Sequence, residues 1–490
     1  MAEFHCSGLK FNIENKRRDK NAGDISKKIR EIKICGDKSI THRALILAAM
    51  AEGISIIKNP SKSEDCLATA DILKKLGAGI KKTKNCIIVE SQGIKKWQAK
   101  NEILDCRNSG TTARLMLGAL AGINEHTFII TGDSSLNKRP MRRVSEPLSK
   151  MGAEIILSDN GSLPGAAAGK NLKGTEFLNR NNSAQVKTAI LLAGLNAGGL
   201  TKIIEPSKTR DHFEKMSKTF GIKLSAKFNS KNEYIIRLKG PQSIKPADIS
   251  IAGDISTAAF YIALDILVKK VYDINLNFKL KNILLNDTRL GFFKVLERAG
   301  IKFNYSNIRE ISGEKSADIM FAGFQDSEKI IKALKINDTD EIVSMIDEIP
   351  LLALVLCFAD GESSISSLGE LRVKESDRLL AVCDNLSALK AKISIKGRDS
   401  LKIHGIKKLK GAVTDSNGDH RIAMMLCIAG FLCGEKFRLK NIECTGISNP
   451  DFFNDQERLG IVMANATTLS SLSSTRQIMS KLTIGRYCFT

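Results

Sequence analysis

The sequence has few aromatic residues and lacks several patterns that would define a class of protein. Aromatic side chains make up 5% of the 490 residues, with one tryptophan, so a base-stacking nucleic-acid surface is not favoured. No uncharged apolar stretch reaches the ~18 residues of a membrane-spanning helix. The 11 cysteines form no CxxC pair and no cysteine–histidine cluster at zinc spacing. We therefore expect reduced, mostly buried thiols in a cytoplasmic protein.

The charge balance is strongly basic. Lysine and arginine number 75 against 53 aspartates and glutamates, a formal net charge of +22. Such a charge fits an anionic partner, which could be nucleic acid, a membrane surface or a small phosphorylated substrate. Because the lysines are scattered along the chain, a general enrichment in lysine explains the charge equally well.

The two ends of the chain differ from the rest. Residues 1–30 are basic but include Glu3, Glu14, Asp19 and Asp24 and lack an apolar segment, unlike a signal or transit peptide. We expect them to be a polar leader. Residues 464–490 are rich in serine and threonine without a clear period, and we expect a C-terminal extension.

The densest group of charges is Arg372–Arg378 (RVKESDR), which separates two apolar segments. If a helix begins near Glu375, then Glu375 and Arg378 share one face of that helix, and Lys374 lies almost on it. One interpretation is a solvated helix face with salt bridges. The other is an anion site, because free N–H groups and the helix dipole favour negative charge at a helix start.

Similar helix starts recur along the chain. They are expected at 36–43 (GDKSITHR), 108–114 (NSGTTAR), 183–187 (SAQVK), 207–212 (SKTRDH), 347–350 (DEIP) and 418–421 (GDHR). The expected N-caps include Ser39, Thr111 or Thr112, and Thr209. Each start alone is also explained by a capped surface helix, and His42, His212 and His420 by helix-end histidines with satisfied hydrogen bonds.

A second pattern divides the chain into six similar parts. The phrase LKKLGAGI, which begins at Leu73, recurs in variants whose glycines stand at 77, 152, 221, 300 and 460, with Lys390 in the remaining place. Each phrase predicts an amphipathic helix, a residue in the left-handed conformation and then a strand. Units of roughly 70–90 residues are too long for common solenoid repeats. The pattern predicts six α/β units, three per domain, although helix–glycine–strand endings are common enough to recur by chance.

Seven motifs in order resemble those of the 5-enolpyruvylshikimate-3-phosphate synthase (3-phosphoshikimate 1-carboxyvinyltransferase) family, in particular its second class. They are GDKSITHR, NSGTTAR, KRPMRR, SAQVKTA, IDEIP, RVKESDR and GDHRIAM, between about Ile32 and about Gly460. The resemblance implies an α/β fold, a two-domain inside-out α/β barrel with three βαβαββ repeats in each domain. One domain would comprise 39–252, and the other 31–38 plus 253–463, with crossovers near Cys35–Lys38 and Ala252–Ser256.

The chemistry that the resemblance implies is enolpyruvyl transfer in chorismate and aromatic amino acid biosynthesis. The 5-hydroxyl of shikimate 3-phosphate attacks C2 of phosphoenolpyruvate while C3 is protonated, and the tetrahedral intermediate then loses phosphate. Each substrate carries a phosphate and a carboxylate, which arginine binds well. No cofactor or metal is implied, and the expected protein is a monomer that binds these small anions but neither nucleic acid nor membrane.

The resemblance also implies a role for each motif residue. The catalytic residues would be Lys38, Asp347, Glu375 and Lys374, with Asp347 as the base for the 5-hydroxyl and Glu375 as the acid for C3. Shikimate 3-phosphate would contact Lys38, Ser39, Arg43, Ser183, Ala184, Gln185, Ser207, Arg210, Asp347 and Lys374. Phosphoenolpyruvate would contact Lys38, Asn108, Gly110, Arg114, Arg139, Gln185, Arg378 and Arg421. A carbon acid needs a raised pKa, which burial favours and nearby cations oppose; the sequence leaves this balance open.

Three departures and three alternatives accompany the resemblance. Many members have Ser-Ser-Gln at 183–185 and Lys-Pro-Tyr at 208–210, and some place a lysine in the segment 444–449, where this chain has none. One alternative is UDP-N-acetylglucosamine enolpyruvyl transferase, whose mechanistic loop cysteine has no counterpart in Thr131–Met141. The others are an inactive relative and, from a different class, a basic nucleic-acid-binding protein supported by charge alone.

Overall fold

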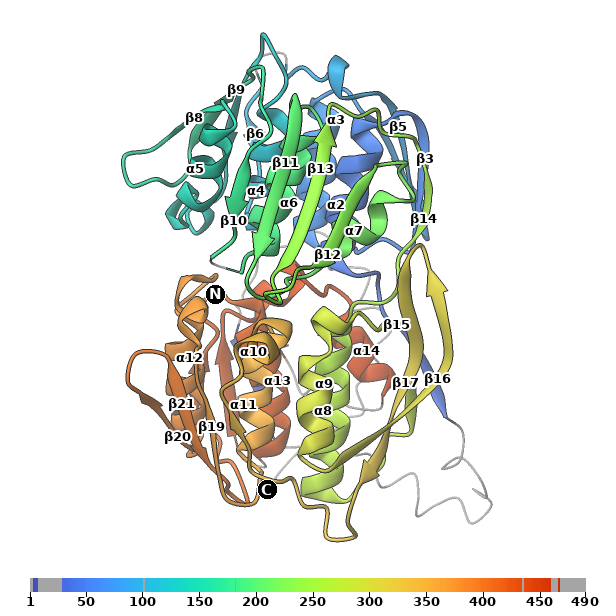
Figure 1. The fold of residues 1–490 in the computed structure, drawn as a ribbon. Coiled ribbons are helices and arrows are strands. Elements are labelled where there is room, and N and C mark those ends of the chain that lie inside the picture. Colours follow the sequence, from blue (N-terminus) through green and yellow to red (C-terminus); the bar gives the residue numbers. More distant parts are fainter. Residues whose placement is uncertain are drawn as a thin grey trace.

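The fold comes from a computed structural model that describes residues 3–7, 29–99, 102–180, 182–433, 436–459 and 466–467. These residues form two lobes, stacked one above the other in Figure 1. Each lobe has three four-stranded sheets around a group of helices. Most of the expected leader 1–30 and extension 464–490, and the expected helix-end glycine at 460, lie outside the described residues.

The upper lobe in Figure 1 is built from the first half of the chain. Its helices are α2 (Lys38–Met50), α3 (Glu64–Lys75), α4 (Gly110–Leu120), α5 (Arg142–Lys150), α6 (Ala184–Gly194) and α7 (His212–Ser217). Its strands are β3 (Glu52–Lys58), β4 (Gly79–Lys82), β5 (Cys86–Gln92), β6 (Leu104–Asp105), β7 (Thr127–Thr131), β8 (Glu154–Leu157), β9 (Gly165–Ala168), β10 (Glu176–Leu178), β11 (Gly199–Glu205), β12 (Leu224–Phe228), β13 (Tyr234–Gly240) and β14 (Asp248–Ser250). The sheet orders are β14-β3-β5-β4, β6-β7-β9-β8 and β10-β11-β13-β12, each with one parallel and two antiparallel pairs.

The lower lobe repeats this arrangement. Its helices are α8 (Ile255–Tyr272), α9 (Gly291–Arg298), α10 (Thr339–Met345), α11 (Ile349–Leu356), α12 (Arg378–Ala388), α13 (His420–Cys433) and α14 (Phe452–Arg458). Its strands are β1 (Glu3–Ser7), β2 (Arg30–Lys33), β15 (Phe278–Leu284), β16 (Ile301–Ile311), β17 (Glu314–Phe324), β18 (Lys335–Ile336), β19 (Glu362–Ile365), β20 (Lys392–Lys396), β21 (Ser400–His404), β22 (Val413–Asp415), β23 (Lys436–Lys440) and β24 (Ala466–Thr467). The sheet orders are β16-β17-β15-β2, β18-β19-β21-β20 and β22-β23-β1-β24, so strands from both ends of the chain complete the last sheet.

The chain passes between the lobes at two adjacent places, after β2 and after β14. Gly36 and Gly253 pair there as an isolated bridge. The Asp37 amide donates to the Ala252 carbonyl at 2.8 Å, and the Asp254 amide donates to the Cys35 carbonyl at 2.9 Å. A Cβ on Gly36 would lie 1.9 Å from a backbone oxygen, so this close approach requires glycine. The two connections therefore form one fixed junction.

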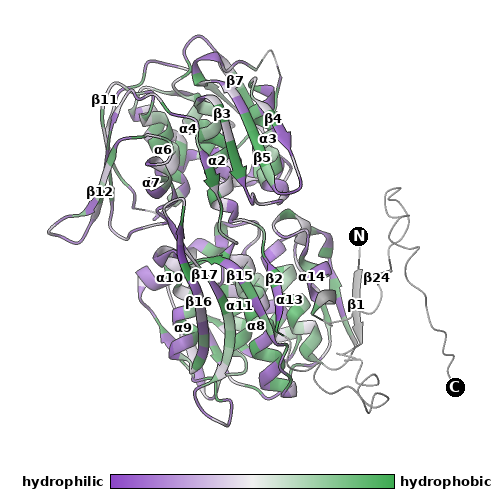
Figure 2. Ribbon diagram, turned by 90° about the vertical axis from the view of Figure 1, so that its right-hand side faces the viewer, coloured by the Kyte–Doolittle hydropathy of each residue, from purple (hydrophilic) through white to green (hydrophobic). Residues whose placement is uncertain are grey.

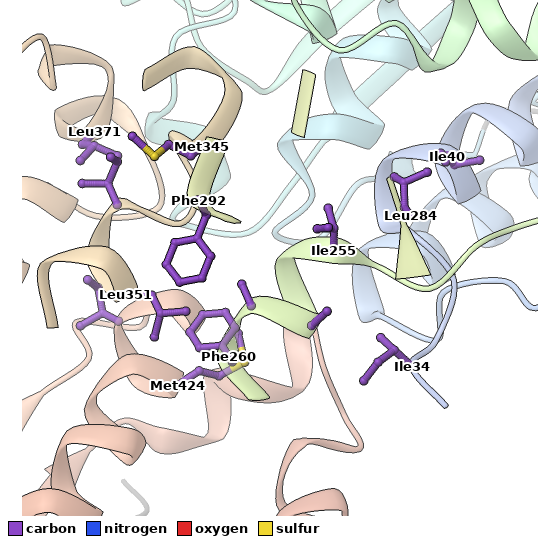
Figure 3. Close-up of a cluster of buried hydrophobic side chains, with 14 of the residues drawn as sticks. Ile34, Ile40, Ile255, Phe260, Leu284, Phe292, Met345, Leu351, Leu371 and Met424 are labelled. Carbon is purple, nitrogen blue, oxygen red and sulfur yellow. The ribbon is translucent and has the colours of Figure 1, made fainter. Parts of the chain in front are cut away.

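The helices occupy the inside of each lobe and the sheets the outside, as the resemblance implies. Helix α8 is buried from Ile255 to Val268 except at Thr257, as expected for a helix surrounded by protein. Figure 3 shows part of this core, where Phe260, Phe292, Met345, Leu351 and Met424 meet from five different helices. In Figure 2 the helices within the lobes carry much of the hydrophobic colour, and the peripheral loops are mostly hydrophilic.

Two helix starts in the cleft differ from the sequence prediction. Helix α2 is capped by Asp37 and not by Ser39, because the Asp37 carboxylate accepts from the Ile40 amide at 2.8 Å. Helix α12 begins at Arg378 with Asp377 as its N-cap, not near Glu375. Glu375 therefore lies in the loop before the helix, and its pairing with Arg378 joins a loop to a helix end.

Two further caps were predicted wrongly. Helix α4 is capped by Ser109, whose hydroxyl accepts from the Thr112 amide at 3.2 Å, and not by Thr111 or Thr112. Helix α7 follows Asp211, because the hydroxyl of Thr209 is instead used for a hydrogen bond to Glu205. For α7 a hydrogen bond to Glu205 occupies the hydroxyl of the predicted cap, whereas for α4 the cap is the residue just before those predicted.

The repeated helix endings have the expected backbone conformation. Residues 77, 152, 221 and 300 are glycines with φ of 101°, 96°, 70° and 94°. Lys390 takes the same left-handed conformation, with φ of 65°. Among the described residues, no helix combines the length and apolarity needed to cross a membrane.

The contact between α4 and α6 generates a stability prediction. A Cβ added to Gly118 would lie 2.2 Å from the Ala189 carbonyl oxygen, so the two helices touch through their backbones. Gly118→Ala should force them apart and lower the free energy of unfolding by about 1–3 kcal/mol in urea denaturation. Gly79→Ala is the control, because its added Cβ would meet its nearest neighbour at 3.5 Å. Equal stability of the two variants would contradict this packing.

Candidate active site

A cavity of about 310 Å³ lies between the two lobes. Its lining includes every site residue expected from the motifs except Asn108 and Ser207. Asn108 lies behind it, where its side-chain oxygen accepts from Arg139 at 2.8 Å. The segment 444–449, where some relatives carry a lysine, contributes Ser448 to the lining. The structure thus brings the motifs to one place, although they are spread over nearly 400 residues of sequence.

The amino ends of helices from both lobes face this cavity. Lys38, Gly110 and Ala184 are the first residues of α2, α4 and α6 in the upper lobe. Arg378 begins α12 in the lower lobe, and Arg421 is the second residue of α13. Unpaired N–H groups and the helix dipoles therefore add to the charge of the side chains, which makes the cavity suited to anions.

Arg43 joins two of these helix ends. Its guanidinium donates to the carbonyl oxygens of Ser39 at 2.9 Å and Ala184 at 3.3 Å, and to the Thr188 hydroxyl at 2.7 Å. Burial is the main cause that lowers the pKa of Arg43 to about 10, so the side chain remains a cation at neutral pH. Arg43 therefore fixes α2 against α6 while it contributes positive charge to the cavity.

Ion pairs connect the lobes across the cavity. They are Arg210–Asp347, Arg139–Glu375 at 3.4 Å and Arg143–Glu370 at 3.0 Å. In each pair the cation comes from the upper lobe and the carboxylate from the lower one. Arg143 and Glu370 were not singled out as site residues by the sequence, although both lie within or beside its motifs. These pairs hold the two faces of the cavity within reach of one small molecule.

Asp347 is surrounded by cations. Burial raises its pKa, but four nearby cations together lower it by more. In order of effect they are Arg421, Arg210, Lys374 and Arg378. The resulting pKa lies well below the usual value, so Asp347 is ionised at neutral pH. An ionised carboxylate among donors can accept a proton from a bound hydroxyl group.

Glu375 resolves the balance that the sequence left open. Burial raises its pKa, but the positive charges of Arg378, Arg139 and Lys38 together lower it more. The pKa of Glu375 therefore lies well below its usual value, and Glu375 is ionised at neutral pH. A proton-donating role for Glu375 thus requires bound negative charge that neutralises these cations first.

Lys38 has a partner that sequence reasoning missed. Its ammonium group lies 2.5 Å from the carboxylate of Asp65, and its backbone amide donates to Asp254 at 3.0 Å. Burial lowers the pKa of Lys38, but Asp65 and then Glu375 raise it more. Asp65 is the second residue of α3, in an ordinary acidic helix start that matches none of the seven motifs, so no local signal identifies it.

Asp419 and His420 also belong to the site. The fully buried carboxylate of Asp419 accepts a hydrogen bond from Arg378 at 2.8 Å. Burial lowers the pKa of Arg378, but Asp419 and the other nearby carboxylates together raise it above its usual value. His42 and His212 are each hydrogen-bonded through Nδ1, to Thr69 and Glu314. Each of the three histidines keeps one buried ring nitrogen without a partner among the described residues, Nε2 of His42 and His212 and Nδ1 of His420, so none is fully satisfied as expected. Burial and then Lys38 lower the pKa of His420 to about 4, so it is neutral.

The two-lobed fold is found in solved enolpyruvyl transferases. EPSP synthase from Acinetobacter baumannii has a TM-score of 0.75 at 30% identity, covering 94% of this chain and 99% of that chain. The enolpyruvyl transferase NikO from Streptomyces tendae has a TM-score of 0.70 at 15% identity, covering 94% of this chain and 97% of that chain. At such low identity NikO supports the fold alone.

Sequence comparison gives the same family. The 3-phosphoshikimate 1-carboxyvinyltransferase of Sulfurihydrogenibium sp. (strain YO3AOP1) is 42% identical over 429 residues, 87% of this chain and 96% of the relative. That of Aquifex aeolicus (strain VF5) is 39% identical over 426 residues, with the same coverage of 87% and 96%. The family model described as EPSP synthase (3-phosphoshikimate 1-carboxyvinyltransferase) matches residues 24–455. The chain therefore belongs to the EPSP synthase family of enolpyruvyl transferases.

Proposed function

We propose that this chain transfers the enolpyruvyl group of phosphoenolpyruvate to the 5-hydroxyl of shikimate 3-phosphate. The products are 5-enolpyruvylshikimate 3-phosphate and phosphate, in chorismate and aromatic amino acid biosynthesis. The observation that carries the proposal is a single interlobe cavity lined by the expected cations and carboxylates, in a chain of this enzyme family. We further propose a cytoplasmic monomer with domains at 39–252 and at 31–38 plus 253–463.

The shikimate 3-phosphate site is proposed on the side of α2 and α6. Its ligands are Ser39, Arg43, Ser183, Ala184, Gln185, Ser207 and Arg210, with Lys38, Asp347 and Lys374 from the junction and the lower lobe. The adjacent amino ends of α2 and α6, linked by Arg43, support a phosphate position there. Arg210 stands where many relatives have tyrosine, and its guanidinium adds charge for the same phosphate.

The phosphoenolpyruvate site is proposed between α4 and the lower lobe. Its ligands are Lys38, Asn108, Gly110, Arg114, Arg139, Gln185, Arg378 and Arg421. A Cβ on Gly110 would lie 2.9 Å from Arg114 and 3.3 Å from Arg139, so glycine leaves room for both guanidinium groups. Arg114 donates to the side-chain oxygen of Gln185 at 2.7 Å, which fixes its direction. Burial is the main cause that lowers the pKa of Arg114 to about 10, and it stays charged.

The proposed reaction has an addition and an elimination. In the addition the 5-oxygen bonds to C2 of phosphoenolpyruvate, its proton passes to Asp347, and the C2–C3 double bond takes a proton from Glu375. In the elimination C3 returns a proton to Glu375, the double bond reforms and the C2–O bond to phosphate breaks, while the proton held by Asp347 leaves with the phosphate. The carboxylate and phosphate of the substrate neutralise Arg139 and Arg378, so burial can then raise the pKa of Glu375.

The comparisons do not favour the alternatives. The relatives matched over most of the chain are named 3-phosphoshikimate 1-carboxyvinyltransferases, not UDP-N-acetylglucosamine enolpyruvyl transferases or nucleic-acid-binding proteins. The proposed carboxylate pair of Asp347 and Glu375 also argues against an inactive relative, because both stand in the cavity with their cationic partners.

The first prediction concerns the substrates. Phosphate should be released when shikimate 3-phosphate and phosphoenolpyruvate are both present, and not with either one alone, because each supplies one half of the new bond. A colorimetric phosphate assay measures this. Release with UDP-N-acetylglucosamine in place of shikimate 3-phosphate, or tight salt-sensitive DNA binding without turnover, would contradict the proposal.

The second prediction concerns the acid. Glu375→Gln should keep substrate affinity within a few-fold, because the amide retains the shape of the side chain. Turnover should fall by about 10²–10⁴, since a positioned proton donor contributes that much. Steady-state kinetics and calorimetric binding measure the two effects. Glu362→Gln, which removes a surface carboxylate paired with Lys402, should leave both unchanged. Near-normal turnover of Glu375→Gln would remove the residue from the acid role.

The third prediction concerns the cations that hold Glu375 ionised. Arg139→Gln removes one of them and should raise the pKa of Glu375 in the protein alone. Carbon NMR of glutamate-labelled protein measures this, with the Glu375 signal assigned by its loss in Glu375→Gln. Arg298→Gln breaks a surface pair with Glu341 and should not move that titration. Identical titrations in the two arginine variants would contradict the electrostatic account.

A further inference from the structure

We propose that Glu205 is a positioning residue that holds the two upper-lobe segments of the shikimate 3-phosphate site, 183–185 and 207–210, in place. The inference rests on the proposed function. Glu205 is the last residue of β11 and is fully buried, so it does not touch the substrate. Figure 1 shows β11 beside α6, the helix that begins with the first of these segments.

The second segment is held directly. One oxygen of Glu205 accepts from the Thr209 hydroxyl at 2.6 Å, and the other accepts from the Thr209 backbone amide at 3.2 Å. Thr209 is itself buried and immediately precedes Arg210, whose guanidinium faces the cavity. These two hydrogen bonds fix the backbone at Thr209 and therefore the position from which the Arg210 side chain enters the cavity.

The first segment is held through Asn179. The Asn179 amide nitrogen donates to Glu205 at 2.8 Å and to the Ser183 carbonyl at 3.2 Å. Its oxygen accepts from the Ser183 amide at 3.3 Å. Ser183 is the N-cap of α6, so this chain of contacts sets where the amino end of that helix lies. One buried carboxylate therefore determines the spacing between the α6 helix start and Arg210.

Lys187 makes such a carboxylate compatible with an anion site. Its ammonium group is fully buried and lies 3.0 Å from Glu205 and 2.8 Å from Glu214. Its positive charge offsets the negative charge of Glu205, and that negative charge would otherwise repel a bound phosphate. A carboxylate also accepts stronger hydrogen bonds than a neutral group, which suits a residue that must hold two segments rigidly.

Glu214 provides a matched control within the same cluster. Its carboxylate pairs with Lys187, and its second oxygen has no hydrogen-bond partner among the described residues. Burial raises the pKa of Glu214 and Lys187 only partly offsets this effect, so the ionised form of Glu214 is disfavoured in the folded protein. Glu205→Gln and Glu214→Gln each leave Lys187 with one carboxylate. They differ in that Glu205 alone of the two is bonded to Thr209 and Asn179.

The test compares the two variants in steady-state kinetics with both substrates. Glu205→Gln should raise the KM for shikimate 3-phosphate about tenfold or more, since hydrogen bonds to a charged group are lost. The KM for phosphoenolpyruvate should rise clearly less, because Gln185 is the one proposed phosphoenolpyruvate ligand in the segments that Glu205 holds, while α4 and the lower lobe are untouched. Glu214→Gln should leave both KM values unchanged. Thr209→Val removes one donor without changing charge, and should raise the same KM to a smaller extent even if Glu205→Gln fails to fold.

Specific outcomes overturn the inference. Wild-type KM values in both Glu205→Gln and Thr209→Val would do so, as would an equal rise in both KM values or an equal effect of Glu214→Gln. A merely structural role would lower stability without separating the two substrates. Absence of turnover in the wild-type protein would overturn the proposed function and the positioning with it, whereas normal wild-type turnover with an unshifted Glu205→Gln overturns the positioning alone.

Discussion

The site depends on many positive charges that are buried in and around the space between the two lobes. The folded protein tolerates them because most of these cations are paired with a buried carboxylate. The pairs are Lys38–Asp65, Arg289–Asp37, Arg378–Asp419 and Lys187–Glu205. A buried cation without such a partner costs several kcal/mol. Arg43 and Arg114 are the contrasting cases, since burial lowers the pKa of each to about 10 and backbone or amide oxygens replace the carboxylate. The partner carboxylates thus decide how many cations a small cavity can hold.

The inside-out fold turns this local balance into a site. Because the helices lie inside each lobe, their amino ends reach the interlobe face, where sheets would present only edges. The paired crossovers at Gly36 and Gly253 bring α2 and α8 to the same junction, so their caps Asp37 and Asp254 both approach Arg289. The geometry of the cavity is therefore linked to the one place where the chain passes between lobes.

The sequence predicted the elements of the site better than their local geometry. Most residues that line the cavity belong to short contiguous motifs, and such motifs can be recognised in the sequence without knowledge of the fold. The N-cap of α2 was missed because Asp37 reaches the Ile40 amide, and the start of α12 because its cap is Asp377. Asp65 and Glu205 could not be found, since their roles come from contacts with residues distant in space and unmarked in sequence. Ionisation of Glu375 likewise depends on distances that only the folded chain sets.

The ionised state of Glu375 gives the proposed reaction an order. While Arg378 and Arg139 hold the pKa of Glu375 low, it has no proton to give to C3 of an enolpyruvyl group. In the proposed reaction, bound phosphoenolpyruvate would supply negative charge beside these cations and let burial raise the pKa of Glu375. Shikimate 3-phosphate would draw Arg210 away from Asp347, its partner in the structure. The proposed acid thus depends on bound phosphoenolpyruvate and the proposed base on bound shikimate 3-phosphate. The same cations that bind the substrates would then set the protonation states of both carboxylates, so that the addition needs both anions in the cavity.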